Sequence, residues 1–478
     1  MIRLIKNEIV KLFHKTSVYV VLIIALAFVI LLNYLSSSFV DNEVVSYNEI
    51  DITSVNDFIS NYNPNVDSLD EYAYNLALLD SYNLAKEYDA GSWQYAVFMD
   101  EYLRLNTEYY KELYSTKDSD TIEDINALLL EMLQKIYSDD WKYFANMDKE
   151  ALEEEINGYD EALKSETSNT EIINININKN VAEERLALVE YRLEEDVSYT
   201  NDYLNQAIFD IENVLYSVAE YRYNLGADRK DYARELKTYY ENKYILEEKI
   251  DTNSSDNLRS GIVNFFSNYS FLIIVFVIMV AGSIVSEEFS KGTIKSLLTV
   301  PYSRAKILTA KLITVLLSIP FIILFLLVCE LIVGGITFGF SSLGIVVPTY
   351  NIATNSVDVL NVFSYLFVNT LANLPELILL ALLAFTCSVL FNSTAFAITI
   401  TFCGMIGSEL INAFALSFDI KFLDYFVTTN WNFSYYLFGG SSPFGLTMGH
   451  SLLVCFTYLV IMITIAYAVF SNRDIKNV

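Results

Sequence analysis

Six long apolar runs constrain this chain more than any other feature of its sequence. Each holds about 20 mainly apolar residues, and a helix of that length crosses the roughly 30 Å hydrocarbon layer of a bilayer. Inside lipid every backbone N–H and C=O group must be paired within the protein, so such runs fold as helices. The predicted spans are residues 17–35, 265–285, 312–338, 363–391, 394–416 and 451–470.

Charge divides the chain into two parts. Of its 478 residues 53% are apolar, yet the net charge is -28. Residues 36–262 hold 19 Lys and Arg against 49 Asp and Glu, a net charge of -30, whereas the remainder holds 12 against 10. We therefore expect an all-α membrane protein with six transmembrane helices. An acidic helical domain, residues 36–262, is inserted between spans 1 and 2, and residues 263–478 carry spans 2 to 6.

Basic residues predict the orientation of the spans. Residues 1–16 carry four lysines and arginines and the loop 286–311 carries five, whereas loop 339–362 carries none and loop 417–450 only Lys421. Because cytoplasmic loops are enriched in such residues, we expect both termini inside a cell membrane and the acidic domain outside. All four cysteines lie in apolar runs. An outer domain without disulfides fits a bacterial protein.

Two segments carry local patterns. Ile2, Ile5 and Ile9 recur at helical spacing among basic residues, which predicts an amphipathic helix over residues 1–16 lying in the membrane interface, or a simple positive anchor. In the acidic domain, apolar residues at a three-four spacing predict one long helix over 181–225. Residues 165–180 form a polar stretch in which isoleucine and asparagine alternate over 173–178, which fits either an edge strand or a loop.

Signatures of catalysis and of resident metals are missing from the sequence. The chain has two histidines, His14 and His450, and no Gly-x-Ser-x-Gly, His-Glu-x-x-His or Cys-x-x-Cys pattern. The phosphate-binding Gly-x-x-x-x-Gly-Lys-Ser/Thr loop is also missing. We expect no catalytic residue, metal or cofactor in this chain. If the protein uses ATP, the nucleotide and its Mg²⁺ belong to a separate subunit.

The loop 286–311 carries a pattern that resembles a known family. Its residues are similar to the hallmark loop of ABC transporter type 2 permeases. They are Glu287, Glu288, Gly292, Thr293, Leu297, Leu298, Pro301, Ser303, Arg304 and Lys311. The six spans and the inward termini agree with that family. The resemblance does not cover residues 36–262, because most members carry a short loop there.

This resemblance implies that the loop contains a coupling helix docked in a groove of an ATPase subunit. The coupling residues would be Glu287, Glu288, Gly292, Thr293, Leu297, Leu298, Pro301 and Arg304. Leu297 and Leu298 give the helix an apolar face, and the carboxylates can form ion pairs across the interface. The implied partners are a dimer of ABC ATPase subunits and either a second copy of this chain or another permease. In the alternative interpretation, the loop only anchors span ends with positive charge.

Three glutamates lie within predicted spans: Glu330, Glu376 and Glu409. A charged carboxylate at the centre of a bilayer costs at least about 2.5 kcal/mol, so each should face protein or water. They are candidates for a substrate path. In the alternative interpretation, they form hydrogen bonds between helices or lie near the outer surface.

These features predict the permease subunit of an ATP-driven exporter rather than an enzyme. The charge of the acidic domain would attract a cationic partner, and a cationic antimicrobial peptide is the first expectation. Export of a lipid-linked or glycan substrate is an alternative in the same class. A membrane-anchored sensor or scaffold, whose outer domain binds a partner, is the alternative from a different class. Nucleic acid is not an expected partner.

Overall fold

The chain folds into two compact units. One unit holds residues 1–38 and 254–478, here called the membrane unit, and the other holds residues 39–253, here called the inserted unit. The computed structural model describes residues 1–39, 52–64, 68–89, 92–115, 118–166, 168–199, 203–224, 226–251, 258–294, 302–391, 393–418 and 420–473.

The membrane unit is built from helices, six of which are long and apolar enough to cross a membrane. These six are α2 (Thr16–Phe39), α14 (Phe265–Ser283), α17 (Arg304–Phe338), α18 (Val362–Leu390), α19 (Thr394–Phe418) and α20 (Met448–Asn472). Three shorter helices complete the unit: α1 (Ile2–Phe13), α13 (Leu258–Val263) and α15 (Ser286–Ser290). The prediction of an all-α membrane protein with six spans is confirmed.

The third span begins earlier than the sequence predicts. Hydropathy places its start at residue 312, but α17 begins at Arg304. Ser303 caps the helix by accepting a hydrogen bond from the backbone N–H of Lys306 at 3.4 Å. The cap starts the helix two turns before the apolar run. The loop between spans 2 and 3 is therefore shorter than predicted, and its first residues form α15.

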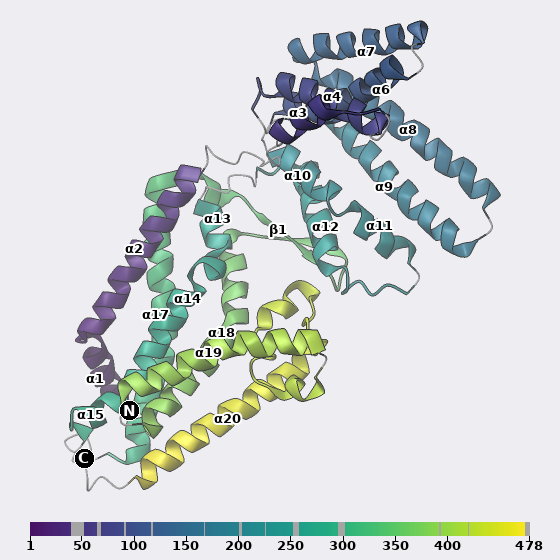
Figure 1. Cartoon of the computed structure of the whole chain (residues 1–478). Helices are drawn as coiled ribbons and strands as arrows, with labels where there is room; N and C mark the ends of the chain where they lie inside the picture. Colours follow the sequence, from purple (N-terminus) through teal and green to yellow (C-terminus); the bar gives the residue numbers. More distant parts are fainter. Residues whose placement is uncertain are drawn as a thin grey trace. The chain divides into compact units, whose positions relative to one another are not determined.

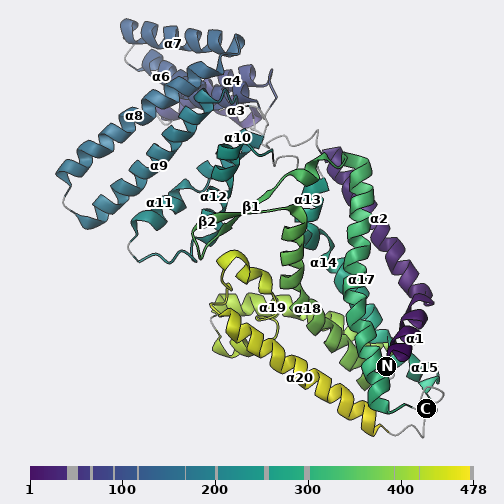
Figure 2. The same cartoon turned by 180° about the vertical axis from the view of Figure 1, so that it is seen from behind.

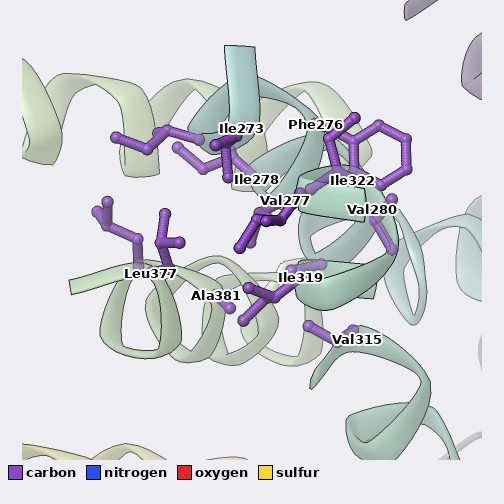
Figure 3. Packing of buried hydrophobic residues seen from close by; sticks show 14 of the residues in the cluster. Ile273, Phe276, Val277, Ile278, Val280, Val315, Ile319, Ile322, Leu377 and Ala381 are labelled. Atoms are coloured by element: carbon purple, nitrogen blue, oxygen red, sulfur yellow. The ribbon is translucent and has the colours of Figure 1, made fainter. Parts of the chain in front are cut away.

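The centre of the membrane unit is α14, which contacts α17, α18 and α19. Its apolar side chains interlock with those of α17 and α18 (Figure 3). The labelled residues of this core are Ile273, Phe276, Val277, Ile278, Val280, Val315, Ile319, Ile322, Leu377 and Ala381. By contrast, only 17% of the apolar window of α19 is buried. An exposed apolar face is what a helix that touches lipid or another membrane subunit requires.

A hairpin interrupts the helices of the membrane unit. Strands β1 (Val347–Asn351) and β2 (Ser356–Leu360) connect α17 to α18 and pair in antiparallel register, Val347 opposite Leu360 (Figure 2). Asn355 makes the turn with φ +56°, a conformation that asparagine tolerates better than most residues. Single turns of 3₁₀ helix, η2 (Ser341–Gly344), η3 (Lys421–Tyr425) and η4 (Phe433–Gly439), lie in the loops.

The inserted unit is a bundle of helices (Figure 1). They are α3 (Ile52–Asn61), α4 (Leu69–Ala85), α5 (Trp93–Val97), the π-helical turn η1 (Phe98–Tyr102), α6 (Leu103–Tyr114), α7 (Ser119–Tyr137), α8 (Trp141–Ser165), α9 (Asn169–Glu194), α10 (Tyr203–Glu212), α11 (Leu215–Tyr223) and α12 (Ala233–Glu248). Phe98, Ile136 and Phe144 belong to one buried apolar cluster, and Leu152 and Val189 to another. The unit thus has apolar cores of its own.

The prediction of one long helix over 181–225 is wrong. That stretch forms the end of α9 and the separate helices α10 and α11. Asp196 adopts φ +58°, and the Arg192 guanidinium donates to the carbonyls of Val197 and Ser198 at 3.2 and 3.3 Å. These bonds stabilise a reversal of the chain. The apolar spacing persists on both sides of the break, so periodicity does not reveal it.

Residues 169–180 are also helical, so both interpretations offered for this stretch are wrong. They form the first half of α9, which packs along α8. Ile177 is buried, and the amide of Asn176 donates to the Ile172 carbonyl at 2.7 Å within the helix. Packing of one helix face decides the conformation here, against an alternating pattern that favours a strand.

Candidate functional site

The N-terminal helix α1 presents charged side chains to the start of α17. Glu8 and Leu12 lie on its buried face, one turn apart, and Glu8 is only 7% exposed. Lys11 follows Glu8 by three residues, and its Nζ lies 3.3 Å from Glu8 Oε1. Phe13 packs edge-on against Phe321 of α17, with ring centroids 4.9 Å apart. The helix is thus held against the membrane unit by both apolar and charged contacts.

Lys311 of α17 lies at the centre of these charges. It is 1% exposed, and its Nζ lies 2.7 Å from Glu8 Oε2 and 3.3 Å from Glu288 Oε1. The same ammonium donates to the Ile284 carbonyl at 3.0 Å. An ammonium has three N–H donors, and here each has an acceptor. A buried charge is tolerated only when it is paired in this way.

Two further lysines, Lys11 of α1 and Lys15 just after it, contact the end of α14 and the segment that follows. Lys11 Nζ lies 3.0 Å from Glu288 Oε1, and Lys15 pairs with Glu287. Lys15 also donates to Ser283 Oγ at 3.2 Å. We call Glu8, Lys11, Lys15, Glu287, Glu288 and Lys311 the charged cluster. Its three carboxylates and three ammonium groups balance, and together they connect α1, α15 and α17.

The cluster keeps Glu287 and Glu288 ionised. Burial by itself would raise the pKa of Glu288, but the charge of Lys311 and hydrogen bonds from Thr293 and Lys11 lower it to about 2. Burial likewise opposes ionisation of Glu287, and Lys15 and Lys291 overcome it, so that the pKa of Glu287 lies below its usual value. Both groups are therefore anions at neutral pH.

A second set of contacts joins the ends of α17, α18 and α20 to α15. Arg304 at the start of α17 donates to the carbonyls of Ser471 and Arg473 at 3.1 and 2.9 Å. Arg473, directly after α20, donates to the Val389 carbonyl of α18 at 2.6 Å. Its guanidinium also lies 4.4 Å from the centroid of the Phe289 ring of α15. Arg304 thus has a structural role beside the one that the resemblance implies.

The predicted coupling residues fall into two groups. Glu287 and Glu288 lie in α15, and Gly292 follows with φ +69°, a conformation that favours glycine. Thr293 Oγ1 donates to Glu288. The two carboxylates thus pair with lysines of their own chain, whereas the sequence suggested pairs across an interface. Leu297, Leu298 and Pro301 lie outside the described residues.

The three glutamates of the spans have different surroundings. Glu330 is 2% exposed and accepts hydrogen bonds from Asn33 of α2 and Tyr269 of α14. Glu376 of α18, which follows Pro375, is half-buried. Glu409 of α19 is exposed. Glu376 and Glu409 thus lie on two helices that contact each other, while Glu330 forms hydrogen bonds between helices.

Sequence reasoning missed Glu8. It is the only acidic residue among the first 40, and it lies among lysines and arginines. A lone carboxylate on the apolar side of a basic helix indicates a buried ion pair. Its partner Lys311 lies 303 positions away, so local patterns do not identify the pair.

Comparisons with known proteins identify one family and two relatives, all of unknown function. Residues 231–476 match the model of a family described as "Protein of unknown function (DUF2705)". The chain is 29% identical over 239 residues to the uncharacterized protein YhcI of Bacillus subtilis, which covers 49% of this chain and 75% of the relative. It is 28% identical over 221 residues to the uncharacterized membrane protein YdbK of the same organism. This match covers 45% of this chain and 83% of the relative. No solved structure matches.

The buried ammonium makes a prediction about stability. Replacing Lys311 by methionine keeps the length of the side chain but leaves Glu8 and Glu288 short of a counter-charge. We expect Lys311→Met to lower the free energy of unfolding by about 3–5 kcal/mol. The matched change Lys306→Met, at an exposed lysine of the same helix, should stay within about 0.5 kcal/mol of the unmodified chain. Unfolding of the purified chain in detergent measures both, and equal effects would contradict the assigned role.

Proposed function

The chain belongs to the DUF2705 family of proteins of unknown function, and from its own residues we propose that it is the permease subunit of an ATP-driven ABC exporter. The observation that carries this proposal is the charged cluster. It joins the start of the loop between spans 2 and 3 to α1 on one side and to α17 on the other. A soluble partner that pushes on this loop would therefore move two further helices with it.

The geometry of the loop supports a mechanical role. Its described start, α15, is fixed by Glu287 and Glu288, and its far end is fixed by Ser303 and Arg304 at the start of α17. Between these anchors lie the apolar residues Leu297 and Leu298. A loop anchored firmly at both ends transmits force, whereas a loop that only marks the cytoplasmic side needs no such anchors.

ATP hydrolysis is assigned to a separate subunit in this proposal. The sequence holds no phosphate-binding loop, so nucleotide and Mg²⁺ would bind to a dimer of ABC ATPase subunits. Both termini and the loop between spans 2 and 3 would face the cytoplasm, as the distribution of lysine and arginine indicates. The inserted unit would then face the outside of the cell membrane.

A second permease half is part of the proposal. Glu409 is exposed on α19, in a helix long and apolar enough to span the membrane. A charged group facing lipid costs at least about 2.5 kcal/mol, so this face calls for water or protein beside it. Either a second copy of this chain or another permease would supply that surrounding, with Glu376 and Glu409 beside the shared path.

The substrate class follows from charge. Residues 36–262 have a net charge of -30, which attracts cations and steers them to the surface. We propose a cationic peptide, such as an antimicrobial peptide, as the substrate or as the agent against which the transporter protects. The alternative of a membrane-anchored sensor or scaffold draws support from the inserted unit, which has apolar cores of its own.

The coupling loop separates these two functions. We expect an ATPase subunit with a phosphate-binding loop to co-purify with the tagged full chain from its native membrane. Leu297→Asp with Leu298→Asp should abolish both this complex and its ATP hydrolysis, because charged side chains would replace the apolar ones that the proposal assigns to the ATPase contact. Leu297→Ile with Leu298→Ile keeps that face apolar and should preserve both. A complex that survives the aspartates, or a chain that recovers no ATPase, would contradict the transporter and favour the scaffold.

The cationic substrate has its own test. We expect a lysine-rich and arginine-rich antimicrobial peptide to bind the full chain in nanodiscs, with a Kd that rises at least tenfold between about 0.1 M and 1 M salt. Over that range the screening length falls from about 10 Å to about 3 Å. An analogue with glutamine in place of each basic residue is the control and should not bind. Binding that is absent, or that does not change with salt, would remove the cationic peptide from the proposal.

A further inference from the structure

A polar cavity lies toward the end of α17 that is remote from the charged cluster. Its volume is about 190 Å³, roughly ten times what one water molecule needs. Side chains from α2, α13, α14 and α17 line it, among them Asn33, Ser260, Asn268, Tyr269 and Glu330. A space of this size and polarity between membrane helices is suited to a hydrated or polar ligand.

The carboxylate of Glu330 is the only charged group among the residues that line this cavity. Its Oε2 accepts hydrogen bonds from Asn33 Nδ2 at 3.0 Å and from Tyr269 Oη at 2.5 Å. In the part of the chain that the structure describes, no lysine or arginine forms an ion pair with Glu330. Two neutral donors therefore hold this buried carboxyl group.

The donors around Glu330 are already in use. Asn33 Nδ2 donates one hydrogen to Glu330 and the other to the Val29 carbonyl at 3.0 Å. Both N–H donors of this amide are thus used, and its oxygen remains as an acceptor. The single hydroxyl hydrogen of Tyr269 is likewise committed to Glu330. The groups that touch the carboxylate can thus offer a ligand only acceptor atoms, while the serines and asparagines elsewhere in the lining can either accept or donate.

Glycine keeps room for the carboxylate. A methyl group on Gly261 would overlap Glu330 Oε1, and one on Gly334 would lie 3.1 Å from Asn33 Oδ1 and 3.5 Å from Glu330 Oε1. A side chain at Gly261 would displace the Glu330 carboxylate, and one at Gly334 would press on Leu258 and on the Asn33 amide oxygen. The two glycines thus leave the space that the Glu330 carboxylate occupies beside the cavity.

We propose that this cavity binds a primary ammonium group, with Glu330 as its counter-charge. An ammonium has three N–H donors and no acceptor, which is the complement of these groups. A Lys side chain of a peptide and the ethanolamine headgroup of a lipid both carry this group. The site stands on its own geometry and does not depend on the proposed transport function.

The test uses the purified full chain in nanodiscs of phosphatidylglycerol and phosphatidylcholine. Methylammonium chloride should raise the Tm in a saturable way. Tetramethylammonium chloride, which has no N–H donor, and sodium chloride should not do so at equal ionic strength. Glu330→Gln should weaken the methylammonium response at least tenfold. Glu123→Gln, at an exposed glutamate of the inserted unit, removes the same charge and should leave the response unchanged.

A second measurement keeps the test independent of folding. Difference infrared spectra should show a carboxylate band that shifts on adding methylammonium and that is missing from Glu330→Gln. To separate the two sources, N-acetyl-lysine methylamide should compete with methylammonium if a peptide supplies the group. Phosphatidylethanolamine in the nanodisc should remove the methylammonium response if a lipid supplies it. Infrared spectra in which Glu330 is protonated and does not change on adding methylammonium would overturn the proposal. An equal effect of methylammonium, tetramethylammonium and sodium chloride on the Tm would overturn it as well.

Discussion

One buried ammonium determines how the membrane unit is arranged at the end where α1 lies. Lys311 is 1% exposed, and the free energy of burying its charge is recovered only if Glu8 and Glu288 both reach it. Glu8 reaches it only when α1 is folded and docked on α17, and Glu288 only when α15 follows α14 in its observed turn. A single side chain of α17 therefore makes the positions of two other helices interdependent. That interdependence is the physical basis of the coupling that we propose.

The same helix carries a charged group near each end, in two kinds of surroundings. Lys311 and Glu330 are 19 residues apart, roughly 28 Å along a helix. The ammonium is matched by acids of its own chain, whereas the carboxylate is matched by neutral donors beside a cavity. Between them α17 packs its apolar face against α14, and Pro320 removes one backbone hydrogen bond from the helix. A movement imposed on α17 at Lys311 would therefore extend along the helix beyond Pro320.

The spans could be predicted from the sequence alone, whereas much less of the candidate functional site could be. The spans followed from the length of apolar runs, because a bilayer permits few other structures. The sequence did not predict the helix break near Asp196, because apolar spacing continues on both sides of it. The charged cluster was not predicted for a different reason. Its pairs join residues up to 303 positions apart, whereas periodicity reports only on neighbours along one helix. Glu287 and Glu288 were identified as functional candidates, but their partners in α1 were not.

The most direct test of the central claim is the distance between α1 and the start of α17 in the intact chain. Spin labels at the exposed positions Lys6 and Lys306, in a background without the native cysteines, report this distance by pulsed electron resonance. The account predicts one narrow distance distribution that broadens when Lys311 is replaced by methionine. A distribution that is already broad in the unmodified chain, or that ignores the loss of the ammonium, would contradict it.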